Sequence, residues 1–148
     1  MILNLTQHQA TEDQKKRGVF EVSETLKSQI RDLLTFDGLP KEGEVEQRAK
    51  QLARLVSENW ALHQRRFVMV GGAPFFMPAL CQALKEEDFF PLFAFSKRIV
   101  EEDAEGKKVS RFVHEGFVDE SGNPIYLRAC FCGSGLDWTE CGFTEFCG

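Results

Sequence analysis

The sequence predicts an α/β fold in three layers, built on a mostly parallel sheet that ends in an antiparallel hairpin and followed by a small cysteine-rich module. Two apolar segments, residues 1–6 and 67–70, have the length and composition of buried parallel strands. Four of the five cysteines lie in residues 129–148. A chain of 148 residues is long enough for one sizeable core and an appendage. We therefore expect an α/β domain over residues 1–120 and a separate tail over residues 121–148.

The first half of the chain predicts one strand and three helices. After the strand at residues 1–6, Thr11 and Gln14 have the spacing of a capping box and predict a short helix that Gly18 ends. Ser23 can cap a second helix whose apolar residues share one face. The clearest amphipathic helix lies in residues 43–60, where apolar residues recur every three or four positions.

The middle of the chain predicts a strand, a glycine turn, a helix and a second strand. Residues 67–70 form the first strand, residues 71–73 the turn, and the helix continues to about residue 87. The second strand covers residues 92–95. Two parallel strands joined by a helix form a right-handed βαβ unit.

The following residues predict antiparallel pairing. Residues 95–118 contain two strand-like segments around a turn at residues 103–106, which indicates a hairpin added to the sheet. Another turn signal precedes a last strand at residues 125–131, which leads into the tail.

Composition excludes several functions. The net charge of −5 argues against binding double-stranded nucleic acid, because general affinity for phosphate backbones depends on many lysines and arginines. The longest apolar stretch, residues 67–81, is interrupted by two glycines and two prolines and is too short to span a membrane. The N-terminus lacks the basic and apolar regions of a signal peptide. We therefore expect a cytoplasmic protein with no membrane partner.

A ligand pocket is predicted at the carboxyl edge of the sheet. Ligands of open α/β sheets bind outside the carboxyl ends of the parallel strands, and three such ends are expected to converge there. Glycines let backbone amides approach a ligand, a helix N-terminus favours anions, and basic side chains add charge. We therefore expect a small anionic or nucleotide-type ligand. The candidate ligand-binding residues are Gln7, His8, Gly71, Gly72, Ala73, Ser96, Lys97 and Arg98.

Two features of this pocket leave alternatives open. The Gly71-Gly72 pair fits a ligand-binding turn and equally a plain strand-to-helix turn, because it matches neither the P-loop nor the dinucleotide fingerprint. His8 is a candidate catalytic residue, since an imidazole can donate and accept protons near neutral pH. The alternative is that His8 is a hydrogen-bonded structural residue.

The segments ILNLTQH, VMVGGAPFFMPAL and PLFAFSKR resemble, in their order, small Rossmann-like proteins of phages and mobile elements. They also loosely resemble the CARF-type domains and stand-alone ring nucleases that bind cyclic oligoadenylates in CRISPR defence. The likeness covers about residues 1–118 and is one of layout, without a diagnostic motif. It implies a Rossmann-like domain that binds a cyclic oligonucleotide and cleaves it without a metal, with His8, Ser96 and Arg98 as candidate residues.

The tail is the most specific feature of the sequence. One residue separates Cys130 from Cys132, Gly-Ser-Gly follows, and Cys141 comes after eight intervening residues. In an extended chain Cys130 and Cys132 point to the same side, where two thiolates can occupy adjacent corners of a tetrahedron. In a reducing compartment clustered cysteines are metal ligands more often than disulfides. A disulfide framework and free thiols are the alternatives.

This segment resembles the SEC-C zinc motif, the cysteine-rich tail of the SecA translocation ATPase that also ends many unrelated bacterial proteins. The resemblance implies one Zn²⁺ held by Cys130, Cys132 and Cys141, with a fourth ligand directly after Cys141. That position is Gly142, and Cys147 is the expected substitute, with His114 or water as alternatives. Four thiolates leave no open position, which favours a structural zinc over a catalytic one.

Together these features predict a zinc-containing cytoplasmic binding protein whose pocket takes a nucleotide-type anion. One alternative is a metal-independent phosphodiesterase of the ring-nuclease type with His8 as its catalytic residue. Another is an adaptor that docks a protein partner through the zinc tail. Cys81, on the apolar helix, is predicted to be a buried core residue.

Overall fold

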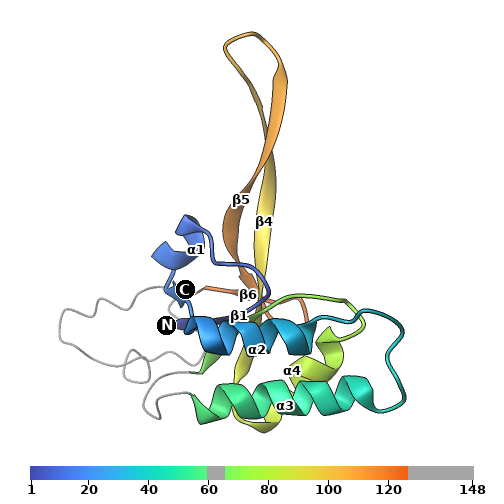
Figure 1. The fold of residues 1–148 in the computed structure, drawn as a ribbon. Coiled ribbons are helices and arrows are strands. Elements are labelled where there is room, and N and C mark those ends of the chain that lie inside the picture. Colours follow the sequence, from blue (N-terminus) through green and yellow to red (C-terminus); the bar gives the residue numbers. More distant parts are fainter. Residues whose placement is uncertain (60–65, 127–148) are drawn as a thin grey trace, which may run out of the picture.

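Strands and helices alternate over most of the chain (Figure 1). The computed structural model describes residues 1–59 and 66–126. The elements are β1 (Ile2–Leu5), α1 (Glu12–Lys16), β2 (Val19–Phe20), α2 (Glu24–Leu34), α3 (Glu44–Glu58), β3 (Phe67–Val70), α4 (Met77–Glu86), β4 (Phe90–Glu102), β5 (Lys108–Val118) and β6 (Pro124–Ile125).

The strands described form one sheet in the order β2-β1-β3-β4-β5-β6. β1 pairs in parallel with β2 and β3, and β3 pairs in parallel with β4. β5 pairs antiparallel with both β4 and β6. The predicted α/β fold, with a mostly parallel sheet and an antiparallel hairpin, is therefore confirmed for the described residues.

Capping residues begin the first two helices, as their spacing predicts. The Thr11 hydroxyl accepts from the Gln14 amide at 3.2 Å, and the Gln14 side chain accepts from the Thr11 amide at 3.0 Å. At the start of α2, Ser23 Oγ accepts from the Leu26 amide at 3.3 Å. α4 has Pro78 in its first turn, where a missing amide costs no intrahelical hydrogen bond.

The two faces of the sheet pack against different elements. On one face, side chains such as Leu5 and Val70 join α2, α3 and α4 in the main hydrophobic core. On the other face, Ile2, Phe67 and Phe117 belong to a smaller core. Consecutive residues of a strand point to opposite faces, and β1 and β3 are buried throughout. This double burial explains why both strands consist of continuous apolar runs.

β4 is longer than predicted, which corrects the expected strand at residues 92–95. It runs for 13 residues without interruption, and only residues 90–93 pair with β3. Residues 94–102 pair, among the described strands, with β5 alone. Where β4 leaves the body, the register shifts between Phe95 and Ser96, and the extra residue of this bulge is Glu115 on β5. The β4–β5 hairpin therefore extends away from the helices (Figure 1).

The last predicted strand, residues 125–131, lies only partly within the described chain. Its described part is β6, which pairs through Pro124 and Ile125 with β5. Residues 127–148, which include the predicted tail, lie outside the described residues. Among the helices of the described residues, none has the length and apolar composition needed to cross a membrane.

Because Leu80 lies in the main core and Leu39 lies on the surface, we expect the two leucines to contribute very differently to the free energy of unfolding. Leu80 on α4 is 0% exposed, whereas Leu39 is 97% exposed. Leu80→Ala should lower the free energy of unfolding by about 2–5 kcal/mol, because it leaves a cavity between α4 and the sheet. Leu39→Ala should change it by about 0.5 kcal/mol or less. Urea unfolding followed by circular dichroism measures both, and equal losses would contradict the packing described.

Candidate functional site

The chain reverses its direction across the sheet after β2, which creates a switch point between β1 and β3. It passes through α1 to β2 on one side of β1, and then through α2 and α3 to β3 on the other side. Crossovers between parallel strands are almost always right-handed, so the reversal places α1 on one face and α2–α4 on the other (Figure 1). Open α/β sheets bind ligands at such a switch point, outside the carboxyl ends of the strands.

The turns after β1 and β3 lie side by side at this edge. A Cβ atom at Gly71 would lie 3.4 Å from Thr6 Cγ2, so the two turns are in contact. Gly72 has φ +151°, and a Cβ there would meet Met77 Cε at 3.4 Å and Leu34 Cδ2 at 3.9 Å. Both the backbone conformation and the close neighbours therefore favour glycine at position 72.

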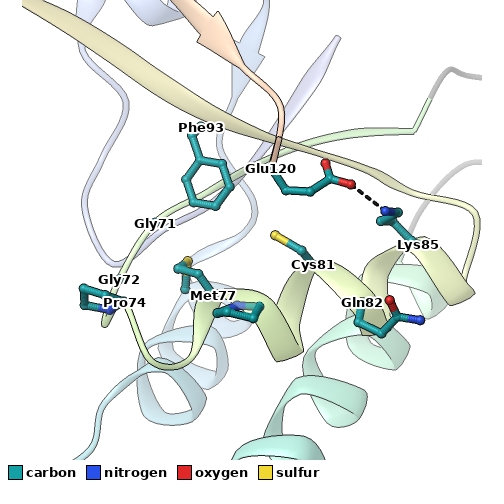
Figure 2. Close-up of a pocket in the computed structure, with 10 residues that line it drawn as sticks. Gly71, Gly72, Pro74, Met77, Cys81, Gln82, Lys85, Phe93 and Glu120 are labelled. Atoms are coloured by element: carbon teal, nitrogen blue, oxygen red, sulfur yellow. Dashed lines mark hydrogen bonds and ion pairs between the residues drawn. The ribbon is translucent and has the colours of Figure 1, made fainter. Parts of the chain in front are cut away.

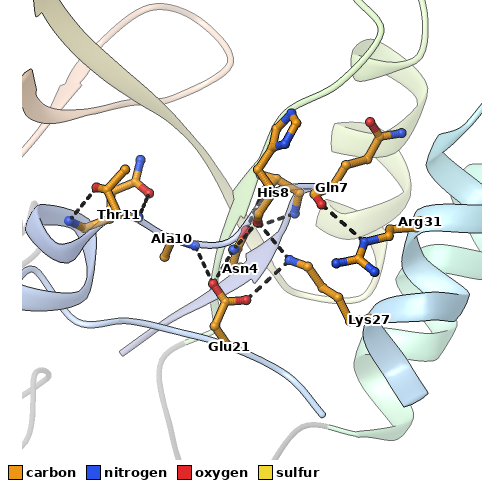
Figure 3. A network of polar contacts seen from close by, with 10 residues as sticks. Asn4, Gln7, His8, Ala10, Thr11, Glu21, Lys27 and Arg31 are labelled. Carbon is orange, nitrogen blue, oxygen red and sulfur yellow. Dashed lines mark hydrogen bonds and ion pairs between the residues drawn. The ribbon is translucent and has the colours of Figure 1, made fainter. Parts of the chain in front are cut away.

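The buried side chain of Asn4 shapes the loop after β1 (Figure 3). Its Nδ2 donates to the His8 carbonyl and to Glu21 Oε1, both at 2.8 Å. Its Oδ1 accepts from the Thr6 amide at 3.0 Å and lies 2.7 Å from the Thr6 hydroxyl. Asn4 is 0% exposed, so these contacts replace the hydrogen bonds that water would otherwise make. Hydrogen bonds from a buried side chain therefore fix the conformation of this loop.

Lys27 is a buried cation that joins α2 to the same loop. It is 2% exposed, and its Nζ donates to the His8 carbonyl at 3.0 Å and to Glu21 Oε2 at 3.3 Å. Burial alone would raise the pKa of Glu21, but hydrogen bonds from Ala10 and Asn4 and the charge of Lys27 hold that pKa below its usual value. Glu21 is therefore ionised at neutral pH and balances the buried ammonium.

Gln7 and His8, two of the predicted ligand-binding residues, lie in this loop. Gln7 Nε2 donates to Thr35 Oγ1 at 3.1 Å, and the Gln7 carbonyl accepts from Arg31 Nε at 3.4 Å. The His8 carbonyl belongs to the Asn4 network, whereas its imidazole is exposed and points away from that network (Figure 3). No described residue donates to or accepts from the imidazole. The His8 backbone thus has a structural role, and catalysis by its side chain stays a prediction.

A cleft of about 620 Å³ opens beside the Gly71-Gly72 turn, between α4 and β4 (Figure 2). Much of its wall is apolar and includes Met77, Pro78 and Phe93. An ion pair closes one end, where Lys85 Nζ on α4 lies 2.5 Å from Glu120 Oε1 in the turn after β5. The lining residues are Gly71, Gly72, Pro74, Met77, Pro78, Cys81, Gln82, Lys85, Phe93 and Glu120.

The titratable groups of the cleft do not form an activated nucleophile. Burial raises the pKa of the Cys81 thiol to about 11, with the charge of Glu120 adding to this effect and that of Lys85 opposing it. Cys81 is 4% exposed, which confirms the predicted buried position, and its thiol is protonated at neutral pH. The hydrogen bond from Lys85 to Glu120 raises the pKa of Lys85, so the Lys85 ammonium stays charged at neutral pH. The arrangement suits binding better than covalent catalysis.

Three predicted ligand-binding residues lie away from the cleft. Ser96, Lys97 and Arg98 lie inside β4, beyond the residues that pair with β3. Arg98 Nη2 is 3.5 Å from Ser110 Oγ on β5. At the usual rise along a strand, Arg98 is on the order of 15 Å from Phe93. The expected strand end at residues 96–98 is therefore wrong, because β4 continues beyond the point where the parallel sheet ends. A role of these three residues in ligand binding stays a prediction.

Of the remaining predicted residues, Gly71 and Gly72 line the cleft, and Ala73 packs against the main core. The sequence analysis did not single out the α4 side of the cleft. Met77, Cys81 and Lys85 are spaced four residues apart and share one face of α4, a pattern that could have indicated this wall. Glu120 has no such signal, because the turn between β5 and β6 brings it there from a distant part of the chain.

His114 is a buried histidine on β5. It is 8% exposed, and neither ring nitrogen has a hydrogen-bond partner within residues 1–59 and 66–126. Its ring packs edge-on against Phe117, with centroids 4.8 Å apart. Burial and the charge of Arg17 lower the pKa of His114, while Asp13 opposes them, so the imidazole is neutral at neutral pH. His114 is also an alternative fourth ligand of the predicted zinc. The three cysteines of that site lie outside the described residues, so this role stays a prediction.

The predicted zinc ligands Cys130, Cys132, Cys141 and Cys147 all lie outside the described residues. Within the part of the chain that the structure describes, no three histidine, cysteine, aspartate or glutamate side chains are grouped so that they could hold a metal ion.

The protein is therefore an α/β protein with a switch point in its sheet and a largely apolar cleft beside it. Its residues 1–118 match the uncharacterized protein MJ1673 family, and the chain belongs to that family. The match ends at the last residue of β5, before the predicted cysteine tail. No curated protein and no solved structure matches the chain.

The Glu21–Lys27 pair predicts a pH-dependent loss of stability. At neutral pH Glu21→Gln should lower the free energy of unfolding by about 1–3 kcal/mol, because it leaves a buried ammonium without its carboxylate. The folded state lowers the pKa of Glu21 from 4.5, so its stabilisation is present above that pH and is lost as pH falls through the lowered value. The difference between wild type and variant should therefore shrink in acid.

Glu12→Gln is the matched control for this measurement. Glu12 also pairs with a lysine, Lys15 at 3.3 Å, but its side chain is 83% exposed. Surface pairs of this kind contribute about 0.5 kcal/mol or less. Urea unfolding at neutral and acidic pH should separate the two variants, and equal losses at neutral pH would show that the buried network does not stabilise the loop.

Proposed function

We propose that this protein binds a small anionic ligand with an apolar part, such as a nucleotide, in the cleft between α4 and β4. The observation on which this proposal depends is the position of the cleft, which begins at the Gly71-Gly72 turn beside the switch point of the sheet. Its volume of about 620 Å³ lies within the range of small-molecule sites.

The anionic end of the ligand would lie at the turn and the start of α4. The first amides of an α-helix have no intrahelical acceptor and lie at the positive end of the helix dipole. The N-cap residue Phe76 makes no side-chain capping hydrogen bond. Its own amide donates to the Ala73 carbonyl at 2.9 Å and Pro78 has no amide hydrogen, so the candidate donors of this first turn are the amides of Met77 and Ala79. Glycine at positions 71 and 72 leaves the backbone open to close approach.

The apolar end of the ligand would lie along the wall formed by Met77, Pro78 and Phe93. A flexible thioether and an aromatic ring are suited to a flat heterocycle. The Lys85–Glu120 pair at the far end offers both a donor and acceptors to polar groups of that heterocycle. A nucleotide combines these three kinds of group, and a cyclic oligonucleotide repeats them.

Binding is preferred to cleavage as the proposed function because of the groups that line the cleft. The thiol of Cys81 is protonated, and Lys85 and Glu120 are paired with each other. The ring-nuclease alternative depends on the exposed His8, which does not line this cleft. Under that alternative, His8→Ala would abolish turnover of a cyclic oligoadenylate and leave its binding unchanged.

Filling the cleft should abolish binding without unfolding the protein. Gln82 is an exposed residue of the cleft wall, so Gln82→Trp places a large side chain in the cavity, whereas Glu86→Trp adds the same side chain one turn further along α4. Nucleoside mono- and diphosphates and cyclic oligoadenylates should be tested by thermal shift. At least one should raise the melting temperature of the wild type and of Glu86→Trp but not of Gln82→Trp.

Two results would count against the cleft as a nucleotide site. One is that no member of the panel raises the melting temperature of the wild type. The other is that Gln82→Trp and Glu86→Trp respond equally to a ligand that does.

We also propose that the tail holds one structural Zn²⁺ through Cys130, Cys132, Cys141 and Cys147. The spacing of the first three cysteines and the Gly-Ser-Gly between them support this proposal. Thiolates are the preferred ligands of structural zinc, and a short segment gains most of its folding energy from the metal. Such a site belongs in a reducing compartment such as the cytoplasm, and its folded surface would provide the docking site for a protein partner.

Metal analysis of matched cysteine variants tests the zinc proposal. Protein purified without chelator should contain one zinc per chain, and Cys132→Ser should lose most of it because a tetrahedral site loses a ligand. Cys81→Ser should retain the metal, since Cys81 is a buried residue of α4 in the main core. Zinc-free wild-type protein, or equal zinc contents in both variants, would exclude the site. Cys147→Ser then tests the fourth ligand.

A further inference from the structure

The hairpin arm, defined as residues 96–102 of β4 and 108–113 of β5, has an open backbone edge. β4 pairs with β3 only through residues 90–93. Beyond that point, β5 is the one described strand that pairs with it. The edge of residues 94–102 that faces away from β5 therefore presents backbone donors and acceptors to a further strand. Figure 1 shows this arm extending well beyond the body of the protein.

The arm also exposes apolar side chains. Phe112 is 73% exposed, Val100 58% and Val109 47%. A two-stranded ribbon has little stability in water unless further strands or a core support it. The helices α2, α3 and α4 pack in the main core at the body, and the side chains of the arm do not belong to that core. The arm thus has the properties of a surface that another strand would stabilise.

The charges of β4 are segregated along the arm. Its sequence from residue 97 to residue 102 is Lys-Arg-Ile-Val-Glu-Glu, with two cations near the body, two apolar residues in the centre and two carboxylates near the tip. Charged side chains often keep an edge strand from pairing, but on this edge the charges are of both signs. Here a parallel alignment of two copies would oppose like charges, whereas an antiparallel alignment brings opposite charges together.

We propose that the arm pairs with the arm of a second copy of this chain, β4 against β4 and antiparallel, about a two-fold axis at Val100. Side chains alternate along a strand, so Arg98, Val100 and Glu102 share one face of the arm. In this register Val100 faces Val100 of the second copy, and Arg98 faces Glu102 of the second copy. The symmetry makes the same contact twice, as an isologous interface requires.

The charges already paired within the arm are compatible with this register. Glu101 accepts from Arg111 at 2.9 Å within the same arm, so it does not need a partner from the second copy. Glu102 lies opposite Lys108 in the β4–β5 ladder. The dimer would therefore add Arg98 of the second copy on the other side of Glu102, so that positive and negative charges alternate across three strands. On the fourth strand Phe112 lies opposite Arg98. Carboxylates near the tip also make a polyanion an unsuitable occupant of this edge.

Charge reversal tests the arm directly. Analytical ultracentrifugation of the wild type should show a dimer at micromolar concentration that weakens at high salt. Arg98→Glu and Glu102→Arg should each raise the dissociation constant by on the order of tenfold or more, because each opposes like charges twice. An equimolar mixture of the two variants should recover the dimer, since every opposed pair is then of opposite charge. Lys50→Glu, on α3, is the control of equal charge change for Arg98→Glu.

A symmetric cysteine cross-link provides a second test that does not depend on charge. Val100→Cys places two thiols across the proposed axis, so mild oxidation should give a covalent dimer at higher yield than in the wild type. Val109→Cys, which lies on β5 and away from the axis, should not. Circular dichroism confirms that the variants are folded. A monomeric wild type, a dimer that neither charge reversal weakens, or equal cross-linking of the two cysteine variants would each overturn the proposal.

Discussion

The handedness of crossover connections is the constraint on which the rest of this structure depends. Because β2 lies on one side of β1 and β3 on the other, right-handed connections must leave β1 and β3 toward opposite faces of the sheet. This requirement separates α1 from the three larger helices and buries β1 and β3 on both faces. It also leaves two turns, after β1 and after β3, in contact at one edge. The cleft begins at the second of these turns.

The polar network behind the first turn follows from that burial. β1 is buried along its length, yet it contains Asn4, whose side chain cannot reach water. Its hydrogen bonds are completed by the loop that follows and by Glu21, and Glu21 in turn balances Lys27. A buried ammonium is costly unless it is paired and hydrogen-bonded. The same few atoms therefore hold the loop, the end of β2 and the start of α2 together.

The sequence predicts those parts of the fold that depend on neighbouring residues. Capping by Thr11 and Ser23 and the double burial of β1 and β3 are local or periodic signals, and the structure confirms them. The length of β4 was not predictable in this way. Its composition changes from apolar to charged after Phe95, which suggested two strands, but the change reflects where the body ends and not a break in conformation.

The candidate site shows the same division between local and distant information. Gly71 and Gly72 were predicted because a strand, a glycine pair and a helix are consecutive in the chain. Glu120 was not, since it reaches the cleft only after the chain has passed through both strands of the hairpin and returned. The Asn4–Glu21–Lys27 network likewise joins three elements whose approach depends on the topology. The pattern of residues in a single sequence does not show which distant elements of the chain lie close together in the fold.

β4 connects the two regions for which functions are proposed, and a bulge in its partner strand β5 lies between them. Phe93 forms part of the cleft wall, while Arg98 and Glu102 lie in the arm. At the register shift opposite Phe95 and Ser96, β5 contains one extra residue, Glu115, and such a bulge increases the twist of the hairpin at the point where β3 no longer supports it. The direction of the arm is therefore set by the bulge and by pairing with β5, not by the parallel sheet. Charge changes beyond the bulge affect the edge of the arm, whereas substitutions before it affect the core and the cleft.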